Sequence, residues 1–241
     1  MNRRDALRSL GALTASVTVA PYVGAKELRN VPLETALDEK FVPSPARTGG
    51  LSVLVDDTER KTLAAAFDRL LPADEFGPSA TEAGCIEFLD AQLAGPFGEG
   101  ASLYREKPLQ PNADALMQTP QFIATPKERY KAGLAALEAY AQKHDGAAFA
   151  DLQPNRQDEI LAGMESGGIE LGKSVNTKAF FELMLINVRE GYFSDPIYGG
   201  NKDMAGWKMI GFPGARYDYR PYADRTGEDL DLQPVSLIPL D

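Results

Sequence analysis

Five amphipathic runs with helical spacing constrain the fold of this 241-residue chain more than any other feature of its sequence. In each run apolar residues recur every three or four positions, whereas the alternating pattern typical of strands is almost absent. The first run follows Asp56 and Glu59, which have capping-box spacing, and it stops at Pro72. Ser79 and Glu82 have the same spacing ahead of the second run. The pattern predicts an all-α domain.

The third run has the clearest helix start. Thr125 is a favourable N-cap residue, Pro126 suits the first helical position, and Glu128 completes a capping box. Two further helices are predicted at 154–165 and 177–190, each followed by a glycine placed to end it. We therefore expect about five helices, packed in an orthogonal or bundle-like arrangement.

The chain divides into three parts. Residues 1–25 have the composition of an export signal, and residues 26–54 contain prolines and glycines without a sustained period, as in an extended lead-in. The helical domain occupies 55–241. From about residue 191 it continues as a long irregular tail rich in aromatic residues, glycine and proline.

The export signal combines a basic head with an uncharged middle at 9–25. The adjacent Arg3 and Arg4 resemble a twin-arginine signal, which carries proteins across a membrane already folded. An ordinary secretory signal or a basic terminus would share most of this pattern. Removal of residues 1–25 would take away three arginines and one aspartate, and would change the formal charge from −10 to −12.

Composition excludes several classes of function. With a formal charge of −10 and no basic stripe, the chain is not expected to bind nucleic acid. One histidine and one cysteine cannot supply a zinc site or attach haem covalently. Cys85 lies on the apolar stripe of the second helix, so we interpret it as a small buried hydrophobe, with an interchain disulfide as the alternative.

The segment that follows the fifth helix is the least ordinary part of the sequence. It has no regular period, yet burial of each of its aromatic side chains is worth about 1.5–3 kcal/mol, so it should not lie free in water. Either it folds back and caps the helices, or part of it forms a surface for another protein, and both can be true. The candidate partner contacts are Tyr192, Phe193, Asp195, Pro196, Tyr198, Asn201, Trp207 and Phe212.

Acidic residues near this segment offer the remaining routes to chemistry. Glu190, Asp195 and Asp203 could place two carboxylates together, as in a glycosidase, and Asn201 could join the aspartates around calcium. No glycine-rich stretch has the spacing of a nucleotide-binding loop. The sequence therefore assigns no catalytic, cofactor or metal residue to this chain, and an exported stand-alone hydrolase is the enzyme alternative.

Three long stretches of the sequence resemble the gluconate 2-dehydrogenase subunit 3 family. The most specific is the aromatic and glycine segment at 190–208, which continues through 211–219. The segments 70–78 and 149–152 agree with the same family. The resemblance covers about 57–219 and extends to the export signal.

The resemblance implies a non-catalytic small subunit of a membrane-associated sugar dehydrogenase. In such a complex a large subunit of the glucose-methanol-choline oxidoreductase type holds FAD, and a multihaem cytochrome c subunit carries the electrons onward. The small subunit would stabilise the flavin subunit and escort it through the twin-arginine translocase to the periplasm, where the complex is associated with the inner membrane. Nothing in this chain selects the substrate. A free-standing exported binding protein is the non-enzymatic alternative.

Overall fold

Helices dominate the part of the chain that the structure, a computed structural model, describes. It contains six α-helices and no β-strand in that part, which confirms the predicted all-α class. The export signal with Arg3 and Arg4, most of the lead-in and most of the connection after residue 96 lie outside the described residues. No helix in the described part is both long and apolar enough to span a bilayer. The described residues are 50–101, 103, 124–216 and 218–237.

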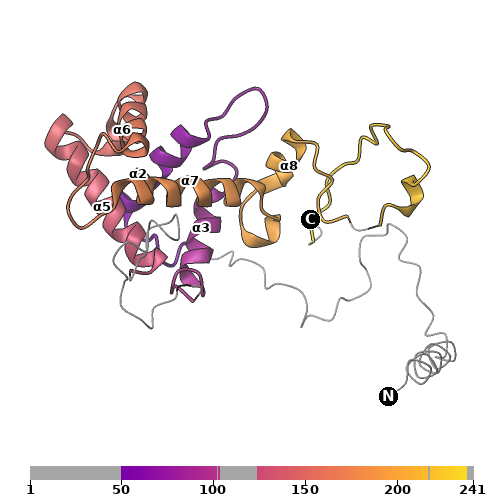
Figure 1. Cartoon of the computed structure of the whole chain (residues 1–241), viewed down its shortest axis with the longest axis horizontal. Helices are drawn as coiled ribbons and strands as arrows, with labels where there is room; N and C mark the ends of the chain where they lie inside the picture. Colours follow the sequence, from indigo (N-terminus) through magenta and orange to yellow (C-terminus); the bar gives the residue numbers. More distant parts are fainter. Residues whose placement is uncertain (1–49, 102, 104–123, 217, 238–241) are drawn as a thin grey trace, which may run out of the picture.

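Helix α7 is the element around which the others pack. It contacts α2, α3, α5, α6 and α8, and it runs through the middle of Figure 1. The α-helices are α2 (Asp57–Leu70), α3 (Cys85–Ala94), α5 (Pro126–Asp145), α6 (Pro154–Ser166), α7 (Thr177–Phe193) and α8 (Ala205–Met209). Single 3-10 turns are η2 (Phe149–Asp151), η3 (Pro196–Tyr198), η4 (Lys202–Met204) and η5 (Arg220–Tyr222).

The predicted helix starts are formed by the expected side chains. The Asp56 carboxylate accepts a hydrogen bond from the Glu59 backbone N–H, at 2.9 Å. At the start of α5 Thr125 and Glu128 form a complete capping box. The box of Ser79 and Glu82 also forms, but it closes a turn and α3 begins only at Cys85.

The prediction that α7 ends at Glu190, stopped by Gly191, is wrong, because the helix continues to Phe193. Gly191 serves close packing instead of termination. A β-carbon on it would lie 3.0 Å from Cδ1 of Phe88 and 3.3 Å from Cα of Cys85. The missing side chain lets α7 approach α3 closely, so the helix ends three residues later than expected.

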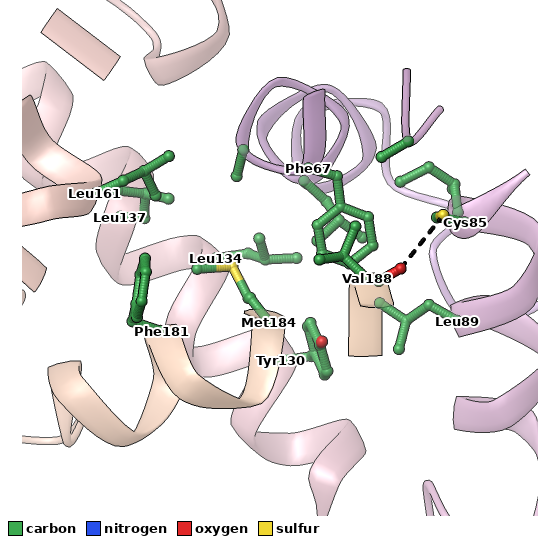
Figure 2. Packing of buried hydrophobic residues seen from close by; sticks show 14 of the residues in the cluster. Phe67, Cys85, Leu89, Tyr130, Leu134, Leu137, Leu161, Phe181, Met184 and Val188 are labelled. Carbon is green, nitrogen blue, oxygen red and sulfur yellow. Dashed lines mark hydrogen bonds between the residues drawn. The ribbon is translucent and has the colours of Figure 1, made fainter. Parts of the chain in front are cut away.

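The core lies between α7 and the helices around it (Figure 2). Met184 and Val188 of α7 are fully buried among side chains from the other helices. Tyr130 of α5 is also fully buried, packs edge-on against Phe180, and its hydroxyl lies 2.9 Å from Oδ1 of Asn187. The tyrosine therefore joins α5 to α7 without leaving its polar atom unsatisfied.

Asp90 of α3 fastens residues 52–54, which precede α2, to the domain. Its buried carboxylate accepts hydrogen bonds from the backbone N–H groups of Ser52, Val53 and Leu54, at 2.7 to 2.8 Å, and from the Ser52 hydroxyl. Leu54 is buried in the core. The end of the predicted lead-in thus packs as part of the domain. Burial raises the pKa of Asp90, but the backbone hydrogen bonds of Leu54, Ser52 and Val53 outweigh it and hold that pKa below its usual value.

Asp90→Asn should destabilise the protein by about 2 kcal/mol at pH 7, because an amide N–H₂ would face backbone donors. Since the folded-state pKa of Asp90 is lowered, its carboxylate stabilises the fold above the unfolded-state pKa of about 3.9 and loses this effect as the pH falls through the folded value. Urea unfolding at pH 7 and pH 3 should show the difference between wild type and variant shrinking.

Glu87→Gln is the matched control, because this carboxylate lies on the same helix and is half exposed in its ion pair with Lys202. It should change the free energy of unfolding by less than about 1 kcal/mol. Equal effects of the two substitutions would contradict the role of Asp90 as a fastening point.

Candidate functional site

The aromatic segment begins with Tyr192 and Phe193 in the last turn of α7, and its continuation folds back onto α7 and α3. Tyr192 is buried and its hydroxyl donates a hydrogen bond to the Pro78 carbonyl, at 2.8 Å. Trp207 is 5% exposed and its indole Nε1 donates to the Phe193 carbonyl, at 2.7 Å. The interpretation that this segment caps the helical core is confirmed.

Asn201 holds the irregular backbone of this segment in place. Its fully buried amide donates to the Ser194 carbonyl and accepts from the Gly206 N–H, both at 2.8 Å. Asn201 and the nearby Asp203 and Met204 all have positive φ, at 47°, 55° and 55°. Positive φ is uncommon in residues other than glycine, although Asn and Asp adopt it more readily, so three such residues within four positions indicate that surrounding contacts hold this backbone.

Asp195 connects the segment to the C-terminal strap, which we define as residues 213–237. One carboxylate oxygen accepts from the Ile197 N–H and, at 2.7 Å, from the Ser236 hydroxyl, and the other accepts from the Leu237 N–H, at 2.9 Å. A short parallel bridge between Gly214 and Val235 closes the strap on itself, and Figure 1 shows it in yellow beyond α8. The strap therefore depends on a buried carboxylate that also caps η3.

The eight candidate partner residues occupy different environments. Four are buried within this chain and support the segment from inside, three are half-buried, and only Phe212, at 44%, is well exposed. Their contact with a partner stays a prediction, although Phe212 presents the largest surface for one. The buried four are Tyr192, Asp195, Asn201 and Trp207, and the half-buried three are Phe193, Pro196 and Tyr198.

Sequence reasoning missed three exposed apolar residues beside this segment, namely Phe76, Met209 and Ile210. Met209 ends α8, a five-residue helix too short to show a period. Phe76 lies in the turn between α2 and α3, more than a hundred residues away along the chain. No sequence pattern could show that these residues would be exposed.

Cys85 is fully buried at the contact between α3 and α7. Its thiol donates to the Val188 carbonyl, with Sγ and oxygen 3.6 Å apart, as Figure 2 shows. Burial, with smaller effects from Asp68 and Glu87, raises the pKa of the thiol to about 12. The predicted buried cysteine is confirmed, and an interchain disulfide would require α3 to separate from α7.

The carboxylates proposed for hydrolysis or calcium binding already have other contacts. Both oxygens of Asp195 accept hydrogen bonds from this chain, and Glu190 accepts one from Asn187. Asp203 is exposed, and the Asn201 amide is committed within the segment. Within the described ranges, no three His, Cys, Asp or Glu side chains are grouped so that they could hold a metal ion.

A groove of about 430 Å³ lies between α2 and α5. Glu138 lines it, but one of its oxygens accepts from the Thr62 hydroxyl and the Phe149 N–H, so the carboxylate stabilises the contact between α2, α5 and η2.

The comparison with family models decides which family the chain represents. A model described as gluconate 2-dehydrogenase subunit 3 matches residues 57–214, more than half of the 241 residues. The chain belongs to this family. Neither a curated protein nor a solved structure matches it. The match begins with α2 and ends at the Gly214 bridge, so it contains the aromatic segment at 190–208 and excludes most of the C-terminal strap.

Asp195→Ala should release the strap and shift the fluorescence of Trp207, the only tryptophan, to longer wavelength, because the strap backbone at Gly214 lies against its ring. The loss of three hydrogen bonds should cost about 2 kcal/mol of unfolding free energy. Asp224→Ala, at an exposed strap position, is the control and should change neither quantity. An unchanged emission spectrum for Asp195→Ala would contradict the role of Asp195 in holding the C-terminal strap.

Cys85 in the native protein should react with a water-soluble disulfide reagent at least about 100-fold more slowly than in urea, because its thiol is buried and protonated. Absorbance of the released thiolate gives both rates, and Cys85→Ala provides the blank. A dimer on a non-reducing gel that is absent in Cys85→Ala would show that the interchain bond forms after all.

Proposed function

We propose that this chain is the non-catalytic small subunit of a periplasmic FAD-dependent dehydrogenase for a sugar, sugar acid or glycoside. In this function it stabilises the flavin-containing large subunit and escorts it through twin-arginine export. The observation that carries the proposal is the match to the gluconate 2-dehydrogenase subunit 3 family over residues 57–214, which contain all six described α-helices. The buried carboxylates of Asp90 and Asp195 accept hydrogen bonds from the backbone of this chain, which agrees with a structural role in assembly.

The partners follow from the same proposal. A large subunit of the glucose-methanol-choline oxidoreductase type would hold FAD and remove hydride from the substrate, and a multihaem cytochrome c subunit would pass the electrons on. The twin-arginine translocase would engage Arg3 and Arg4. The complex would then reside in the periplasm, next to the inner membrane.

Co-expression of the flavin subunit with and without this chain tests the proposal. With the chain present, dye-linked dehydrogenase activity and bound FAD should appear in the periplasmic fraction, and without it both should stay in the cytoplasm or be lost. Equal exported activity in the two strains would overturn the escort function. Turnover by the purified small subunit alone would favour the stand-alone hydrolase.

Replacing both arginines, Arg3→Lys with Arg4→Lys, separates the two export routes. A secretory signal needs only a basic head and should tolerate lysine, whereas twin-arginine export should fall at least about 10-fold. Immunoblots of periplasmic and cytoplasmic fractions measure the change. Cytoplasmic FAD-loaded complex should persist in the variant, which distinguishes an export defect from an assembly defect.

A further inference from the structure

Exposed apolar side chains gather at the α8 end of the molecule. We define the α8 surface as Phe76, Met209, Ile210 and Phe212, whose exposed fractions are 67%, 40%, 58% and 44%. The turn that carries Phe76 adjoins α8, because a β-carbon on Gly77 would lie 4.0 Å from Sδ of Met209. Soluble proteins seldom leave such a group of large apolar residues in water without a use for it.

Surrounding contacts hold the α8 surface in shape. The Asp74 carboxylate accepts from the N–H groups of Phe76 and Gly77, at 2.8 and 3.1 Å, which fixes the turn. Phe212 packs edge-on against the buried Trp207, with ring centroids 5.3 Å apart. Between Ile210 and Phe212 the chain reverses at Gly211, whose φ is +66° and whose α-carbon faces open space. A surface ordered in advance loses less entropy on binding.

Charge argues against two occupants of this surface. The chain carries a formal charge of −10, and the exposed Asp74 and Glu75 border Phe76. A second copy of the same chain would bring like charges together, and an anionic membrane would be repelled. A different protein with an apolar patch and basic residues opposite Asp74 and Glu75 fits both features.

We infer that the α8 surface is where the flavin-containing large subunit binds this chain. The inference rests on the proposed function and specifies its contact residues. It differs from the sequence-based prediction, because it assigns binding to Phe76, Met209 and Ile210 together with Phe212, while Trp207 and Asn201 shape the surface from beneath. Apolar anchors at the centre of an interface carry most of its binding energy.

Ile210→Glu and Phe212→Glu in the full chain test this inference against the matched control Ile186→Glu. Ile186 is 51% exposed on α7 and lies outside the α8 surface. Each α8-surface variant should weaken binding of the co-expressed flavin subunit at least about 10-fold, whereas the control should bind within about twofold of wild type. Interferometry on the purified proteins measures Kd, and thermal unfolding verifies that each variant is folded.

The outcomes separate the two proposals. If wild type and both α8-surface variants bind the flavin subunit equally well, the α8 surface is wrong and the escort function stands. If wild type binds no flavin subunit, the proposed function fails and this inference fails with it. If wild type is a dimer by light scattering and Ile210→Glu is a monomer, the occupant is a second copy of the chain. Should a glutamate variant unfold, Ile210→Ser replaces it with the same expectation.

Discussion

The close contact between α7 and α3 is the constraint on which the rest of the structure depends. Gly191 removes a side chain where Phe88 and Cys85 approach, so α7 continues through the core and delivers Tyr192 to a buried site. The direction in which the chain leaves the core fixes where the aromatic segment can fold. A larger residue at Gly191 would push the helices apart and displace everything that follows.

In the irregular parts of the structure, three buried polar side chains supply backbone hydrogen bonds that regular secondary structure would otherwise provide. Asp90 fixes residues 52–54 before α2, Asp195 fixes the C-terminal strap, and Asn201 fixes the backbone between Ser194 and Gly206. Each makes hydrogen bonds with backbone groups outside the regular helices, and both oxygens of Asp90 and of Asp195 accept hydrogen bonds. These hydrogen bonds hold the irregular parts in place, although those parts lack a repeating hydrogen-bond pattern.

The aromatic segment has an inner and an outer role. Its buried members, such as Trp207, pack against the helices and give the segment its shape. Its outer members, with Phe76 from a distant turn, give the acidic domain a group of exposed apolar side chains. The proposed binding of the flavin subunit draws on both properties, because a surface that is ordered in advance loses less entropy on binding.

The sequence alone determined the helical class, most helix boundaries and the family. Thr125 with Glu128, and the glycine after α6, act through bonds within a few residues, so their effects can be predicted from spacing. The aromatic segment could be predicted as ordered because water is a poor solvent for so many rings.

Only the tertiary structure decided the end of α7, the partners of the buried carboxylates and which apolar residues face water. A glycine after an amphipathic run looks the same in sequence whether it ends the helix or lets a neighbouring helix pack closely. Only the position of α3 shows that Gly191 has the second role. Asp195 and Ser236 are 41 residues apart in sequence, and Phe76 is still farther from Met209. Such pairings arise from the packing of whole helices, which no local pattern encodes.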